Sequence, residues 1–201
     1  MTSLSHESIR TAALELIDRD GLAAFSTRKL GRALGCEAMA IYWYYASKEL
    51  LLDAIVDELM ADITRSVDAD LPDWVGALRA VALAYRRLAH DHPKAFPLLA
   101  TRRFASGGTY VFLERLFELA RRHGVDDRTS ARYYRVVSSY CNGFLLNELA
   151  ASPRPDTAAL RKRFVRVDAV SAWLEPRYLD EIFYFGLELH LGALARERPA
   201  G

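Results

Sequence analysis

Residues 26–48 read STRKLGRALGCEAMAIYWYYASK, and this stretch decides the fold of the N-terminal part of the chain. Ser26 is a typical helix N-cap, so a short helix is expected from there through Leu34. Gly35 permits the tight or left-handed backbone of a turn, and a third short helix is expected over about 37–44. Two short helices joined by such a turn leave one helix exposed, which is the arrangement that enters a major groove of DNA.

The charge of this stretch differs from that of the whole chain. The protein has 27 Lys and Arg against 26 Asp and Glu, so its average charge does not indicate a nucleic-acid partner. Within the stretch, by contrast, one acid, Glu37, stands against a group of basic residues: Arg28, Lys29, Arg32 and Lys48. A local basic excess in a neutral chain is the electrostatic signature of a nucleic-acid contact.

Nearly every other segment has the apolar spacing of a helix. Ser5 caps a first helix that ends near Gly21, and Ser47 caps a fourth that ends before Asp68. Further helices are expected over 73–91, 94–103, 108–123, 127–151, 157–172 and 177–196. Because no strand-like alternation competes with these patterns, the sequence predicts an all-α fold.

The Pro-containing segment from Asp68 to Pro72 is the predicted domain boundary. It divides a small three-helix helix-turn-helix domain (1–47) and a connecting helix (48–68) from a larger helical domain (69–201). Cys36 and Cys141 lack disulfide or metal-ligand spacing, and no signal peptide or membrane-spanning run is seen. We therefore expect a cytoplasmic protein without a membrane partner.

The order T-R-K-L-G-x-x-L-G-C-E-x-x-x-I-Y-W-Y-Y-x-x-K-E from Thr27 onward resembles the DNA-binding domain of the tetracycline-repressor (TetR) family. The resemblance covers about residues 5–63, and FYFGLEL at 183–189 is similar to the closing helix of the tetracycline-repressor branch. It implies that the chain binds double-stranded operator DNA as a homodimer. The residues it places on the operator backbone or behind the recognition helix are Thr27, Arg28, Tyr42, Trp43 and Lys48.

The expected recognition helix departs from the family pattern at Ala38, Met39 and Ala40, where the tetracycline member presents polar groups to base edges. Short apolar side chains contact thymine methyl groups but cannot hydrogen-bond to bases. Specificity is then expected from Tyr42, Tyr44, Arg28 and DNA shape. The alternative is that the aromatic residues are core and the basic residues a solvated face.

The expected helices 127–151 and 177–196 are apolar on more than one side, so one face of each is available to a second subunit. Small residues at two-turn spacing would let two helix backbones approach closely. The predicted dimer interface consists of Tyr133, Val137, Phe185, Gly186, Leu189, Gly192 and Ala193. The alternative is that the small residues serve packing within one chain.

Aromatic residues of the larger domain, with a few polar neighbours, are candidates for an effector pocket. The predicted set is Tyr85, Phe96, Phe104, Tyr110, Phe112, Phe117, Tyr134, Tyr140, Phe144, Asn147 and Glu148. Each of the aromatic residues is individually more typical of core. Comparison with the tetracycline repressor puts Val81 in place of a drug-binding amide and Thr64 in place of a histidine, so a more apolar effector than magnesium–tetracycline is expected.

Other classes of function have little support in the sequence. We find no nucleophile–base–orienter set, no metal cluster and no cofactor fingerprint, so an enzyme is not expected. His90 and His92 are interpreted as capping or solvent residues. The main hypothesis is a repressor that is released by a small, largely apolar effector, with the fourth helix transmitting the change. The alternative is a DNA-binding regulator without such an effector, either an activator or one controlled by a protein.

Overall fold

The computed structural model describes residues 4–65, 67, 71–102, 107–150 and 163–196, and every regular element within these ranges is a helix, which confirms the all-α prediction. The N-terminal helices are α1 (His6–Asp20), α2 (Thr27–Leu34), α3 (Ala38–Tyr42) and α4 (Lys48–Thr64). The helices that follow are α5 (Trp74–Asp91), α6 (Phe96–Arg102), α7 (Gly107–Arg122), α8 (Asp127–Leu149), α10 (Val165–Ser171) and α11 (Leu179–Arg196).

Side-chain caps begin the helices where the sequence predicts them. The Ser5, Ser26 and Ser47 side chains accept hydrogen bonds from the backbone N–H groups three residues on. Asp73 and Asp126 do the same for α5 and α8. Each cap satisfies one of the N–H groups that a helix start leaves without a partner.

Two predicted helices are shorter in the structure because a turn replaces their ends. The third expected helix (37–44) ends at Tyr42, where the Tyr44 and Tyr45 N–H groups both turn back to the Ile41 carbonyl. The sixth expected helix (94–103) begins only at Phe96, because the residues before it form a turn in which the His92 carbonyl accepts from the Ala95 and Phe96 N–H groups. The predicted helix over 157–172 lies partly outside the described residues, and its described part is α10.

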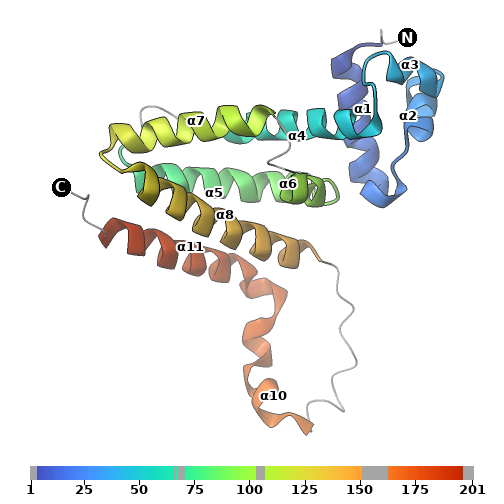
Figure 1. The fold of residues 1–201 in the computed structure, drawn as a ribbon. Helices are drawn as coiled ribbons and strands as arrows, with labels where there is room; N and C mark the ends of the chain where they lie inside the picture. The colour runs from blue at the N-terminus through green and yellow to red at the C-terminus, as the bar shows by residue number, and fades with distance from the viewer. Residues whose placement is uncertain (1–3, 66, 68–70, 103–106, 151–162, 197–201) are drawn as a thin grey trace.

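The helices form two connected units (Figure 1). Helices α1–α3 pack together, with α1 against one end of α4, while the rest of α4 lies in a bundle with α5, α7 and α8. Helix α11 covers the opposite side of α8 and also contacts α5. Because α4 belongs to both units, a displacement of this helix in the bundle must also displace α1–α3.

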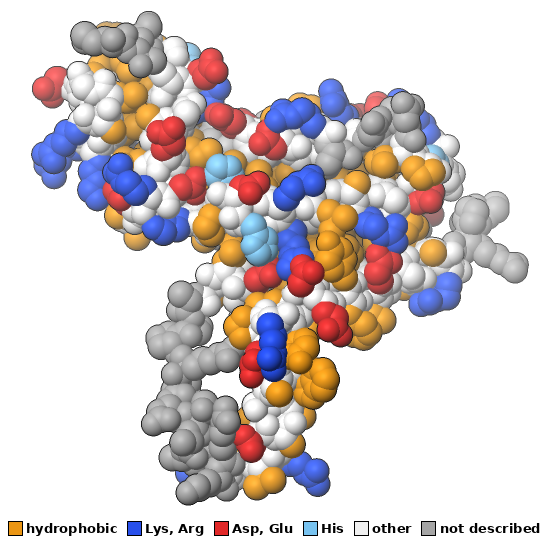
Figure 2. Space-filling view, turned by 180° about the vertical axis from the view of Figure 1, so that it is seen from behind, with side chains coloured by type: hydrophobic (Ala, Val, Ile, Leu, Met, Phe, Trp, Pro, Cys, Tyr) orange, Lys and Arg blue, Asp and Glu red, His pale blue; other side chains and the backbone are white. Residues whose placement is uncertain are grey.

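Residues 163–178, which we call the arm, project away from the bundle (Figure 1). The arm consists of α10 and two short 3-10 turns, Ala172–Leu174 and Pro176–Tyr178. Its exposed large apolar residues are Phe164, Val165, Val167, Val170, Trp173 and Leu174. Figure 2 shows such apolar side chains along the arm, in continuity with those of the bundle.

Candidate nucleic-acid interface and effector cavity

The turn between α2 and α3 brings the two helices unusually close. Gly35 adopts the left-handed conformation (φ +69°), and the Cys36 N–H donates to the Gly31 carbonyl at 2.9 Å. A Cβ atom added at Gly31 would lie 2.7 Å from the Cys36 carbonyl oxygen. Glycine at both positions therefore fixes the angle at which α3 leaves α2.

Helix α3 turns one face inward and leaves the other in solvent. Ile41 is buried, whereas Met39 is 69% and Trp43 88% exposed. The Tyr42 hydroxyl lies 3.2 Å from the Thr27 hydroxyl, so the outer edge of α3 is joined to the first turn of α2. Ala38 and Ala40 are half-buried on the same short helix. Large apolar side chains at such exposure on a single short helix indicate a contact surface.

Tyr44 and Lys48 have partners within the chain. The Tyr44 hydroxyl donates to the Leu4 carbonyl at 2.9 Å, and its ring packs edge-on against His6. The N-terminal segment therefore holds Tyr44, which the sequence had suggested as a base-reading residue. Lys48 Nζ donates to the Phe25 carbonyl at 3.1 Å and lies over the Phe25 ring, so it secures the segment that precedes α2.

The basic residues Arg28, Lys29 and Arg32 are exposed on α2. Figure 2 shows Lys and Arg side chains gathered at the outer edge of the N-terminal unit. Together with the exposed side of α3, they give this unit a surface that is both basic and apolar. That combination suits a phosphate backbone and the edges of thymine bases.

A small cavity of about 40 Å³ lies between α4, α5, α7 and α8. Its lining is formed by Met60, Ile63, Leu78, Val81, Ala82, Tyr85, Phe112, Tyr134, Val137, Ser138 and Cys141. No lining residue carries a formal charge at neutral pH, and the polar side-chain groups are two phenols, one hydroxyl and one thiol. The cavity therefore suits a neutral, mainly apolar molecule.

The predicted pocket residues fall in several places. Tyr85, Phe112 and Tyr134 line the cavity, as does Val137, which was expected at a dimer interface. Phe96 and Phe117 pack behind the lining, edge-on against Tyr85 and Tyr134 respectively. Tyr110 is 65% exposed on the outer side of α7, and Asn147 is exposed on α8. Phe104 lies outside the described residues.

Tyr140 and Phe144 lie at the junction of α8 and α11, where their rings pack on Phe183. The Tyr140 hydroxyl donates to the Phe183 carbonyl at 2.9 Å. Burial, with a smaller effect of the nearby Cys141, raises the pKa of Tyr140 to about 12. These aromatic residues join two helices and do not line the cavity.

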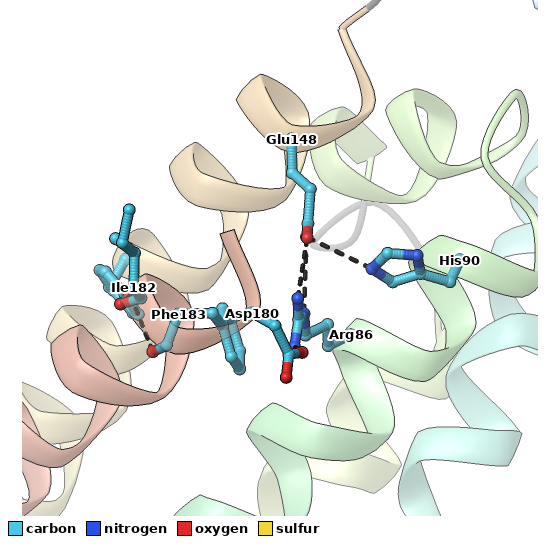
Figure 3. Close-up of polar contacts among 7 residues, drawn as sticks. Arg86, His90, Glu148, Asp180, Ile182 and Phe183 are labelled. Carbon is cyan, nitrogen blue, oxygen red and sulfur yellow. Dashed lines mark hydrogen bonds and ion pairs between the residues drawn. The ribbon is translucent and has the colours of Figure 1, made fainter. Parts of the chain in front are cut away.

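Arg86 and Glu148 form a buried ion pair, with Asp180 and His90 at its exposed edge (Figure 3). The Arg86 guanidinium donates to Glu148 at 2.8 Å and to Asp180 at 2.5 Å, and it stacks over the Phe183 ring. His90 Nε2 lies 3.3 Å from the same Glu148 carboxylate. The Arg86 and Glu148 side chains are only 11% and 8% exposed. Glu148, predicted as a polar anchor for an effector, is thus committed to Arg86.

The outer sides of α8 and α11 carry exposed apolar residues. Phe185 and Leu189, both predicted at a dimer interface, are exposed, whereas Tyr133 is buried and Gly192 and Ala193 are half-buried. A Cβ at Gly186 would collide with the Tyr140 hydroxyl, so this glycine serves packing within the chain. Four further large apolar residues are exposed on these helices, outside the predicted interface set: Val136, Leu146, Ile182 and Tyr184. Sequence reasoning missed Leu146 and Tyr184, although their helical spacing could have revealed them.

Ion pairs between the two units were also missed. Arg102 of α6 pairs with Asp53 and Glu49 of α4, and His92 Nδ1 lies 2.6 Å from Asp18 of α1. His92, interpreted as a capping or solvent residue, is the C-cap of α5, and its half-buried ring has a defined partner in Asp18. Among the described residues, no three His, Cys, Asp or Glu side chains are grouped to hold a metal ion. No helix in the described part of the chain is long and apolar enough to cross a membrane.

Curated relatives match either part or all of the chain. An HTH-type transcriptional regulator of Saccharopolyspora erythraea is 35% identical over 102 residues, which are 51% of this chain and 43% of that protein. The class D tetracycline repressor of Escherichia coli is 40% identical over 43% of this chain and 40% of its own length. The chain thus spans less than half the length of these two relatives. The class G tetracycline repressor of Vibrio anguillarum is 27% identical over 100% of this chain and 98% of its own.

Solved structures share the fold over nearly the whole chain. A possible TetR family transcriptional regulator from Streptomyces coelicolor A3(2) has a TM-score of 0.80 at 26% identity, covering 96% of this chain and 100% of that one. BioQ of Mycobacterium smegmatis with its double-stranded DNA operator has a TM-score of 0.69 at 25% identity, covering 97% and 100%. A TetR variant from Acinetobacter baumannii AYE in complex with minocycline has a TM-score of 0.74 at 25% identity, covering 96% and 98%.

Two family models divide the chain between them. The model of bacterial regulatory proteins of the tetR family matches residues 9–55, which contain α2, α3 and the start of α4. The model of the tetracyclin repressor-like C-terminal domain matches residues 68–195, more than half of the chain. On this evidence the chain belongs to the tetR family of bacterial regulatory proteins.

Proposed function

We propose that this protein is a transcriptional repressor that binds a palindromic operator as a homodimer and is released by a small, largely apolar effector. The observation that carries the proposal is the exposed side of α3, framed by the basic residues of α2. We further propose that residues 1–47 are the DNA-binding domain, 48–68 the connecting helix and 69–201 the effector-binding and dimerisation domain.

In the proposed complex, α3 enters the major groove. Thr27 and Arg28 at the start of α2 meet phosphates, and Tyr42 is held toward the same backbone by its contact with Thr27. Met39 and Trp43 present apolar surface to base edges, which suits thymine methyl groups. BioQ, which has the same fold, has been crystallised with its double-stranded DNA operator, and this supports a DNA partner for the present chain.

The DNA contact is tested by the salt dependence of binding to the chain's own upstream region. Each phosphate neutralised contributes about 0.9 to the slope of log affinity against log salt concentration. Arg28→Ala should lower that slope by about one, because one phosphate contact is lost. Arg121→Ala, which removes an exposed arginine at the far end of α7, is the matched control. Equal slopes in both variants would refute the proposed interface.

We propose that the exposed apolar side of α11, continued on α8, forms the homodimer. A C2 dimer places two copies of α3 on one face, and successive major grooves require a separation of about 34–36 Å. Phe185→Glu should give monomers in sedimentation experiments and abolish operator binding. Val111→Glu, at a similarly exposed apolar position on α7, should leave the protein dimeric. A dimeric Phe185→Glu variant would contradict this assignment.

The chemistry of the cavity supports an uncharged effector. Val81 lines it, and the Thr64 hydroxyl nearby on α4 already donates to the Met60 carbonyl at 2.7 Å. This differs from the polar, metal-assisted binding expected for tetracycline. The cavity holds only about 40 Å³, whereas sites for drug-sized ligands measure about 300–1000 Å³. Binding must therefore part the surrounding helices, which is the change that release from DNA requires.

A thermal-shift screen of neutral apolar compounds tests this part of the proposal, since a ligand that binds the native protein raises its melting temperature. A compound that stabilises the protein should also weaken operator binding. The small size of the cavity also favours a second candidate function, a regulator that responds to no small molecule. A compound that binds without changing operator affinity would support that alternative.

A further inference from the structure

Asn142 on α8 bridges the cavity and α6. The Tyr85 side chain lines the cavity, and its hydroxyl lies 2.5 Å from Asn142 Oδ1. Asn142 Nδ2 in turn donates to the Ala100 carbonyl at 3.2 Å. The Ala100 carbonyl can only accept, so the amide nitrogen must face it and the amide oxygen must face Tyr85. Tyr85 is therefore the donor, and its proton fixes the orientation of the amide that holds α6.

Helix α6 is attached to the N-terminal unit at both ends. At its C-terminal end, Arg102 Nη2 lies 2.9 Å from Asp53 of α4, and Arg102 also pairs with Glu49. Just before its N-terminal end, His92 pairs with Asp18 of α1. Lys94 Nζ donates to the Arg19 carbonyl, also of α1, at 2.5 Å. A shift or rotation of α6 must therefore displace α1, α4 or both.

One further contact, that of Lys48 with the Phe25 carbonyl, connects these attachments to the start of α2. Glu49 and Asp53 lie in the first two turns of α4, directly after Lys48. Lys48 in turn holds the Phe25 carbonyl, one residue before the cap of α2. A continuous set of contacts thus runs from the cavity through Asn142 and α6 to the start of the helix-turn-helix.

We propose that Asn142 is the positioning residue that couples occupancy of the cavity to the placement of α6, and that the effector is a neutral apolar molecule with one hydrogen-bond acceptor. Once the cavity widens, a carbonyl or ether oxygen of the effector that accepts the Tyr85 hydrogen bond leaves Asn142 Oδ1 without its donor. The amide then loses the orientation that holds Ala100, and α6 is released from α8. The consequence at DNA rests on the proposed function, whereas the link from Tyr85 to α4 is a property of the free protein.

Hydrogen exchange of the full-length protein, without DNA or effector, tests the link. Tyr85→Phe removes only the hydroxyl, and Asn142→Leu removes both hydrogen bonds. Loss of one such bond should speed local opening about fivefold, and we expect this change in amides 99–102 of α6 and 51–57 of α4. Asn147→Leu, the same substitution at an exposed position of α8, should leave both segments unchanged.

The double variant Tyr85→Phe/Asn142→Leu should exchange no faster than Asn142→Leu alone, because both changes break the same bridge. Faster exchange confined to α5 and α8, or additive effects in the double variant, would overturn the proposal. Tyr85→Phe keeps the aromatic ring and thus remains informative if Asn142→Leu folds poorly. If the wild type fails to bind its upstream region, the proposed function fails, but the exchange result still decides the role of Asn142.

Discussion

Replacing Arg86 by Met should destabilise the protein chiefly because the buried Glu148 carboxylate loses its arginine partner. The Arg86 and Glu148 side chains are 11% and 8% exposed, and removing one partner of a buried ion pair costs about 3–5 kcal/mol. His90 remains 3.3 Å from Glu148, and the Met side chain still covers Phe183, so we expect the lower value, about 3 kcal/mol. For a chain of this size that is a fall in melting temperature of about 6–12 °C.

The assay is thermal unfolding followed by circular dichroism at one fixed protein concentration, with two further variants. Asp180 is 74% exposed in its pair with Arg86, so Asp180→Asn should cost less than about 1 kcal/mol, or at most about 4 °C. Arg86→Met combined with Glu148→Leu replaces the pair by apolar groups and should recover most of the loss. If Arg86→Met unfolds no earlier than Asp180→Asn, the buried pair does not hold α5 to α8.

Three other substitutions give simpler predictions. Gly31→Ala should lower the melting temperature by about 2–12 °C, because its Cβ would lie 2.7 Å from the Cys36 carbonyl oxygen and such overpacking costs about 1–3 kcal/mol. Gly143, where an added Cβ meets no atom within 4 Å, is the control. An equal effect of Gly143→Ala would refute the steric reason. Val81→Ile places one methylene group, worth about 0.8 kcal/mol, in the cavity and should raise the melting temperature by about 2–3 °C. A fall in the melting temperature would mean that the space is not available. The pKa of Tyr140 is raised to about 12 by burial, so the stability that its neutral form contributes is complete below about pH 10 and is lost as pH rises toward 12; urea unfolding across this range should show a smaller decline for Tyr140→Phe.

Local signals in the sequence predicted the helices well. Ser5, Ser26 and Ser47 each provide a cap whose partners lie within three residues, so their geometry depends on little else. The same holds for Gly35, whose left-handed backbone follows from its own lack of a Cβ atom. These are the features that a short stretch of chain determines by itself.

Contacts between distant helices could not be predicted in the same way. Arg86 and Glu148 are 62 residues apart, and they meet only because of the rotation of α5 against α8. A sequence pattern shows that one side of a helix is apolar, but it does not show what packs against that side. Gly186 was predicted to contact a second subunit, whereas it accommodates Tyr140 of its own chain. Arg102 lay outside the resemblance to the DNA-binding domain, and its pairing with α4 follows from the tertiary fold.

The distribution of these contacts indicates which helices move when the cavity widens. Opening α5 from α8 and α11 would break the buried pair of Arg86 with Glu148, at about 3–5 kcal/mol, together with the bidentate pair of Arg79 with Glu188. Helices α4 and α7 contribute only Met60, Ile63 and Phe112 to the lining, and the Gly108 N–H of α7 donates to Asp57 of α4. Moving α4 and α7 together therefore widens the cavity while sparing both of these ion pairs. The pairs of Arg102 with α4, which this movement strains, are more exposed than the pair of Arg86 with Glu148. Since α4 carries the N-terminal unit, the less costly way to admit an effector is also the one that displaces α3.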